Sequence, residues 1–244
     1  MTPDGYATVT LGHAEWTDGE GGGKHVPLTG RAGCTETRVD AYRTAAGASI
    51  LLPSDREHLC VLLRGAGTLT GDGPHAVDRS SVAFAPAGPA FSLESTDEAT
   101  WLVVSAEADG SPDAEPAVVG VADLDFRVPT TSDVLTARLT DRLGPRGMKV
   151  NVRRLRPGDV VPYHTEGTQE ELFVPLDGNG TVRVDGETYV APRGSVTRVA
   201  PELPRSAVNP GEADVDWLMV GAPPTGAADE WDPGAEDHEW PGGE

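Results

Sequence analysis

Residues 139–180 of the chain read LTDRLGPRGMKVNVRRLRPGDVVPYHTEGTQEELFVPLDGNG, and residues 28–67 read LTGRAGCTETRVDAYRTAAGASILLPSDREHLCVLLRGAG. The two stretches share residues at a constant offset, which pairs Gly33 with Gly144, Val39 with Val150, Arg43 with Arg154 and Gly47 with Gly158. After a two-residue gap, Gly65 and Gly67 align with Gly178 and Gly180. A repeat of about 110 residues has the size of one small domain. We therefore predict a duplicated domain within one chain.

Each unit has the composition of a β-protein. The chain contains 30 Gly and 21 Pro residues, and they separate short apolar runs. This pattern is typical of an all-β barrel or sandwich. In residues 180–190, Val182 and Val184 alternate with polar residues, and Asp185-Gly186 supplies the two positive-φ positions of a tight hairpin. The pair Asp72-Gly73 predicts the same hairpin in the first unit.

The predicted organisation has four parts. Residues 1–108 form the first barrel, residues 109–116 a polar linker, residues 117–222 the second barrel, and residues 223–244 an acidic flexible tail. One helix is conceivable over residues 132–143, because Leu135, Leu139 and Leu143 share a helical face and Gly144 is suited to end it.

The net charge of the chain argues against nucleic acid as a partner. The formal net charge is −20, so the chain would repel a phosphate backbone, and we expect no nucleic acid binding. Lysine occurs only at Lys24 and Lys149, whereas Asp and Glu number 39. This balance resembles that of proteins from halophilic microbes, in which dense surface carboxylates are screened by salt. An ordinary acidic bacterial protein is the alternative.

The expected location is the cytoplasm. The sequence begins MTPDGYATVT, which lacks the basic and apolar regions of a secretory signal, and no apolar run has the length of a membrane span. The cysteines Cys34 and Cys60 have no C-x-x-C spacing, so we expect buried reduced thiols.

The residues suited to metal binding or catalysis lie in the second unit. If residues 160–166 are extended, His164 and Glu166 project from one face, and Glu171 begins the strand that returns beside it. An imidazole and two carboxylates that converge inside a barrel are suitable ligands for a divalent ion.

This spacing resembles the first motif of the cupin superfamily, which is Gly, five residues, His, one residue, His, three or four residues, Glu, six residues, Gly. Gly158, His164, Glu171 and Gly178 match it, and Glu166 occupies the second histidine position. The resemblance extends over nearly the whole chain through the repeat. It implies an all-β bicupin, with two tandem jelly-roll barrels of the double-stranded β-helix type, and self-association, most simply as a homodimer.

Elsewhere the chain departs from the cupin pattern. The second cupin motif runs from a Gly to an Asn, with Pro, Gly and His between them. Gly194 and Asn209 have the separation of its two ends, but Ala200, Glu202 and Arg205 replace the Pro, Gly and His. A guanidinium has no lone pair to offer a metal. In the first unit the motif positions hold Pro53, Asp55, His58 and Ala90, so we expect that barrel to be structural.

Three hypotheses remain for the second barrel. In the first, His164, Glu166 and Glu171, with Gln169 as a fourth ligand, bind Fe, Mn, Ni, Cu or Zn and serve an oxygenase, hydrolase or isomerase reaction on a small molecule. In the second, Arg205 pairs with Glu171 or Glu166, no metal binds, and Arg205, His164 and Tyr163 bind a small carboxylate or sugar. In the third, side chains fill the pocket and the protein is only a folded relic or an assembly partner.

Overall fold

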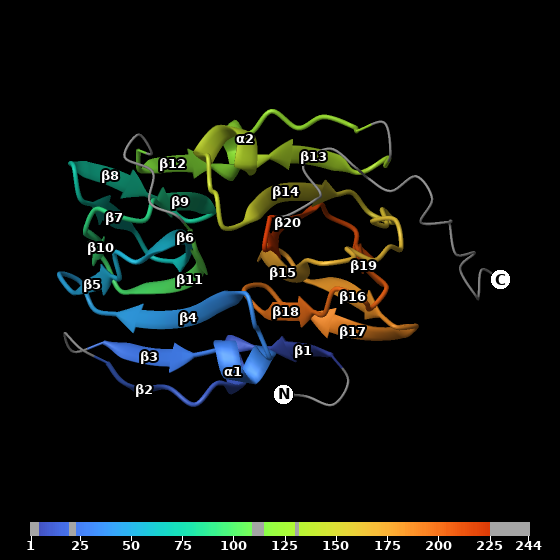
Figure 1. Cartoon of the computed structure of the whole chain (residues 1–244), viewed down its shortest axis with the longest axis horizontal. Helices are drawn as coiled ribbons and strands as arrows, with labels where there is room; N and C mark the ends of the chain where they lie inside the picture. Colours follow the sequence, from blue (N-terminus) through green and yellow to red (C-terminus); the bar gives the residue numbers. More distant parts are fainter. Residues whose placement is uncertain (1–4, 20–22, 109–114, 130–131, 225–244) are drawn as a thin grey trace.

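The structure is a computed structural model that describes residues 5–19, 23–108, 115–129 and 132–224. It is built almost entirely from antiparallel strands. We call the two predicted units, residues 1–108 and 117–222, the first and second halves, and Figure 1 shows them largely side by side. Residues 109–114 of the predicted linker and 225–244 of the predicted tail lie outside the described residues. The all-β prediction is confirmed.

The first half contributes most of two sheets. The larger has the strand order β12-β9-β6-β11-β4-β3-β2, and the smaller has the order β5-β10-β7-β8. Their bounds are β2 Thr17–Asp18, β3 Lys24–Pro27, β4 Thr37–Thr44, β5 Ser49–Leu52, β6 Arg56–Arg64, β7 Gly67–Thr70, β8 Pro74–Val77, β9 Ser81–Ala85, β10 Phe91–Ser95, β11 Ala99–Glu107 and β12 Ala117–Gly120.

The second half contributes most of two further sheets. One has the order β1-β18-β15-β20-β14-β13, and the other has the order β17-β16-β19. Their bounds are β1 Tyr6–Val9, β13 Leu135–Arg138, β14 Lys149–Leu155, β15 Glu170–Asp177, β16 Gly180–Val184, β17 Glu187–Ala191, β18 Val196–Val199, β19 Arg205–Val208 and β20 Val215–Ala222. The helical elements are short and have the bounds η1 Leu11–His13, α1 Thr29–Ala32, η3 Val121–Asp123 and α2 Leu139–Leu143.

The two halves exchange strands. The N-terminal strand β1 pairs with β18 of the second half, from Tyr6 opposite Val199 to Val9 opposite Val196. Strand β12, which follows the predicted linker, pairs with β9 of the first half. The grouping of strands into sheets therefore does not follow a single cut in the sequence.

Three apolar cores stabilise this arrangement. One lies between the two sheets of the first half and includes Leu62 and Trp101, and a second lies between the sheets of the second half and includes Phe173 and Trp217. The third joins the halves, because side chains from β4, β6 and β11 pack with side chains from β14, β15 and β20. Strands β14 and β15 therefore pack on the first half with one face and enclose the second half's own core with the other.

The sequence repeat is visible in local structure. Gly33 and Gly144 end α1 and α2 with left-handed backbone, at φ 73° and 69°. The hydroxyl of Thr29 donates to the Val39 carbonyl and accepts from the Val39 amide, and Thr140 does the same with Val150. The paired Gly67 and Gly180 of the repeat are explained by packing, because a Cβ on either would collide with a tryptophan ring, that of Trp101 or of Trp217.

Two local predictions have different outcomes. The hairpin at Asp185-Gly186 is confirmed, with φ 49° and 82° at these residues between β16 and β17. The helix over residues 132–143 is wrong in its first part, because Leu135–Arg138 form strand β13 against β14 and only Leu139–Leu143 are helical. Pairing with β14 outweighs helical periodicity at this point. Within the described residues, no helix combines the length and apolar character that crossing a membrane requires.

Candidate functional site

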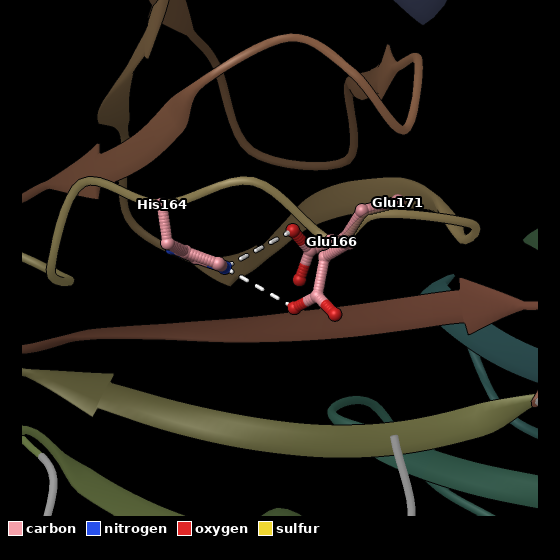
Figure 2. Close-up of side chains that lie close together, drawn as sticks. All are labelled: His164, Glu166 and Glu171. Carbon is pink, nitrogen blue, oxygen red and sulfur yellow. Dashed lines mark hydrogen bonds and ion pairs between the residues drawn. The ribbon is translucent and has the colours of Figure 1, made fainter. Parts of the chain in front are cut away.

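The side chains of His164, Glu166 and Glu171 converge in the second half (Figure 2). His164 lies between β14 and β15 and forms a backbone bridge with Arg205 at the start of β19. Its Nε2 is 3.2 Å from Glu166 Oε1 and 3.9 Å from Glu171 Oε2. Glu171 is the second residue of β15, so it shares a face with Phe173 and is directed toward the core of the second half.

The hydrogen bonds of His164 define what its ring can do. Its Nδ1 is 2.7 Å from the Pro162 carbonyl oxygen, which only accepts, so this nitrogen carries a hydrogen. Nε2 faces the oxygen of Glu166, which also accepts. A neutral imidazole would therefore place a lone pair against a carboxylate. Either a second proton or a metal ion resolves this contact.

Arg205 holds Glu171 in place. Its side chain is 0% exposed, and its Nε donates to Glu171 Oε2 at 3.0 Å. The remaining guanidinium nitrogens donate to the carbonyl oxygens of Pro201 and Leu203 at 2.9 Å and of Gln169 at 3.2 Å. The Arg205 guanidinium stands where the cupin motif has a histidine, and it binds the Glu171 carboxylate. This is the pairing that the second hypothesis requires.

Two further cations influence the cluster. Burial lowers the pKa of Arg153, and the nearby charges of Glu171 and Glu166 oppose that shift. Burial raises the pKa of Glu166, but the hydrogen bond with His164 and the positive charges of His164, Arg205 and Lys149 together lower it to about 2. Glu166 is therefore a carboxylate at neutral pH, in a strongly positive environment.

Lys149 and Arg153 were not predicted as site residues, although strand alternation contains the signal for them. Val150 and Val152 of β14 pack into the core between the halves. Residues 149, 151 and 153 must then face the opposite side, which is the interior of the second half.

Two other predicted residues are placed elsewhere. The side-chain nitrogen of Gln169 donates to the Pro223 carbonyl at 2.6 Å, so this amide binds the chain after β20. The hydroxyl of Tyr163 accepts from the Gly186 amide at 2.9 Å, at the β16–β17 turn. Tyr163 thus binds the β16–β17 turn, whereas its neighbour His164 faces the carboxylates.

The corresponding position in the first half has a different chemistry. His58 is buried, with Nδ1 2.8 Å from Ser105 Oγ and Nε2 2.7 Å from the Pro53 carbonyl oxygen. Burial lowers its pKa. Both ring nitrogens already have partners, which is typical of a structural histidine. Within the described ranges, the group with metal-ligand geometry consists of His164, Glu166 and Glu171.

This group fits a divalent ion in donor type and approximate size. One ligand atom from each residue lies within 4.8 Å of the other two, and imidazole nitrogen with carboxylate oxygen is a common ligand set for transition metals. The contact of Arg205 with Glu171 resembles the outer hydrogen bonds that orient ligating carboxylates. Its positive charge nevertheless opposes a second cation.

Comparison with known proteins agrees with the fold. Residues 151–221 match the cupin domain family, whereas no curated protein matches the chain. A protein of Pseudomonas aeruginosa described as glyoxylate-induced is 18% identical with a TM-score of 0.72, over 90% of this chain and 88% of that one.

Two further solved structures are similar. Oxalate decarboxylase of Bacillus subtilis is 13% identical, with a TM-score of 0.67 over 87% of this chain and 76% of that one. A cupin 2 conserved barrel domain protein of Leptotrichia buccalis is 12% identical, with a TM-score of 0.66 over 88% and 96%. The chain thus has an all-β, cupin-type jelly-roll fold, and its residues 151–221 match the cupin domain family.

Proposed function

We propose that the chain is a bicupin whose second barrel binds one divalent metal ion through His164, Glu166 and Glu171. The single observation that carries this proposal is the position of His164 Nε2, which faces two carboxylates while Nδ1 is committed to the Pro162 carbonyl. The Bacillus subtilis oxalate decarboxylase, which shares the fold, has Mn(II) centres. The first barrel, with His58 fully hydrogen-bonded, has a structural role in this proposal.

The proposed activity is metal-dependent chemistry on a small molecule. A bound Fe, Mn, Ni, Cu or Zn ion would supply a Lewis acid or a site for oxygen. The residues of this chain would hold the ion and its ligand: Arg205 fixes Glu171, and the positive charges of Arg153 and Lys149 attract an anionic group to the interior of the barrel.

Metal content tests the proposal directly. We expect about one Fe, Mn, Ni, Cu or Zn ion per chain in the purified, untagged protein by elemental analysis. His164→Ala removes one ligand of three and is expected to lose that metal. If the protein has no metal above background after incubation with each ion, the proposal is wrong.

A second candidate function is favoured by the buried contact between Arg205 and Glu171. In this case His164 carries a second proton, no metal binds, and the barrel binds a small carboxylate or sugar without catalysis. Arg205→His distinguishes the two proposals. If the natural protein lacks metal and this variant acquires it, the guanidinium excludes the ion in the natural protein, and mass spectrometry of bound metabolites becomes the relevant measurement.

The acidic surface leads to a separate proposal, namely adaptation to high salt. With a formal charge of −20, mutual repulsion of carboxylates destabilises the compact state in dilute buffer, and salt screens this repulsion. The thermal unfolding midpoint is therefore expected to rise strongly between low and molar KCl. A midpoint that stays constant over this range would contradict the proposal.

A further inference from the structure

Glu170 binds the first half of the chain, although it is the immediate neighbour of Glu171. Its side chain is 0% exposed and faces away from the cluster. Its carboxylate accepts from the backbone amides of Thr35 at 2.9 Å, Glu36 at 3.2 Å and Thr37 at 2.8 Å. The hydroxyls of Thr35 and Thr37 donate to it at 3.1 and 2.7 Å.

One further donor, Arg198 Nε of β18, lies 3.1 Å from Glu170 Oε2. The two carboxylate oxygens therefore accept hydrogen bonds from residues 35–37 of the first half and from β18, the strand next to β15. A buried carboxylate with this number of partners has little freedom to move.

The repeat contains a counterpart of this contact. Glu57 of β6 is buried and immediately precedes His58, just as Glu170 immediately precedes Glu171. Its carboxylate accepts from the amides of Arg146 at 2.9 Å and Gly147 at 2.8 Å, in the loop after α2. Each half thus inserts a glutamate into the loop after the short helix of the other half. One of the two glutamates adjoins the candidate site, and the other adjoins a structural histidine.

We propose that Glu170 is a positioning residue through which the first half sets the geometry of the second half's site. The proposal rests on the proposed function in that the site positioned is the group of His164, Glu166 and Glu171. Glu170 is the first residue of β15, so anchoring it to residues 35–37 fixes where the strand begins.

The same anchor determines the contacts of Arg205. The guanidinium donates to the carbonyl of Gln169 on one side of Glu170 and to the carboxylate of Glu171 on the other. A shift of Glu170 therefore moves these two acceptors of Arg205, one of which, the Glu171 carboxylate, also faces His164. Residues 35–37 are in this way part of the support of a site to which they contribute no ligand.

Glu170→Gln tests the proposal, with Glu57→Gln as the matched control. Glutamine keeps the shape of the side chain but presents an NH₂ group to donors. With Mn²⁺ as the probe, Glu170→Gln is expected to weaken binding by about tenfold or more. Glu57→Gln breaks the equivalent contact, which adjoins none of the three proposed ligands, and should leave the affinity within about twofold. Thr37→Val, which removes one hydroxyl donor, is expected to act in the same direction to a smaller extent and serves if Glu170→Gln does not fold.

A second readout separates this proposal from the proposed function. In the metal-free protein, amide hydrogen exchange in residues 163–172 should become faster in Glu170→Gln and stay unchanged in Glu57→Gln. If the natural protein binds no Mn²⁺ but the two variants differ in this segment, the metal proposal fails and the positioning role stands. If both variants change Mn²⁺ affinity and exchange in this segment equally, or neither variant changes them, the positioning role is overturned.

Discussion

Gly180→Ala is expected to lower the free energy of unfolding by about 3 kcal/mol, because the added methyl group has no space. Its Cβ would overlap Cζ2 of Trp217, which is fully buried. The indole cannot move freely, since it packs edge-on against Phe173 with a centroid distance of 6.4 Å. Equilibrium unfolding in guanidinium chloride measures the effect as a lower midpoint.

Gly30→Ala is the control for the loss of a glycine as such. An alanine Cβ at Gly30 meets nothing within 4 Å, so the stability should stay the same or rise slightly. The equivalent position in the first half, Gly67, packs on Trp101 in the same manner, and Gly67→Ala should also destabilise. If Gly180→Ala unfolded at the midpoint of the natural protein, the close packing of Trp217 on β16 would be incorrect.

Arg205→Met is expected to cost roughly 4 kcal/mol of unfolding free energy. The substitution leaves the carboxylate of Glu171 without its charged partner and removes the donor to four backbone carbonyls. The double variant Arg205→Met/Glu171→Leu should recover a substantial part of this loss, because it removes the uncompensated charge as well. Chemical unfolding of the two variants measures the recovery.

Arg154→Met is the matched control for an arginine–carboxylate pair. Arg154 donates to both oxygens of Asp216, at 2.8 and 3.0 Å, but its side chain is 30% exposed. A pair in contact with water contributes about 1 kcal/mol or less, so this variant should lose much less stability than Arg205→Met. Equal losses would mean that the burial of Arg205 has no energetic weight.

The helix end at Gly144 and the turn at Asp185-Gly186 were predictable because their signals are local, whereas neither Asp72 nor Gly73 has the positive φ predicted for the same turn in the first half. Gly144 ends a helix and Asp185-Gly186 forms a hairpin through the backbone preferences of those residues themselves. The convergence of His164, Glu166 and Glu171 followed from strand alternation and motif spacing, and the structure brings these three side chains together.

The remaining parts depend on contacts that are distant in sequence. Pairing with β14 makes Leu135–Arg138 a strand, against their helical periodicity. The Gln169 amide is directed to Pro223 because the chain after β20 lies beside it, and nothing near Gln169 in sequence signals this. Glu170 was overlooked for the same reason, since its partners at residues 35–37 belong to the other half.

The reciprocal exchange of β1 and β12 makes each half dependent on the other. A fragment that starts after the linker would lack β1 and expose the backbone edge of β18, where Tyr6–Val9 otherwise pair. A fragment that ends before the linker would lack β12 and expose the edge of β9. Each half therefore needs a strand of the other to complete a sheet, whichever half binds a ligand. Strand exchange thus makes each half a required part of the other half's fold.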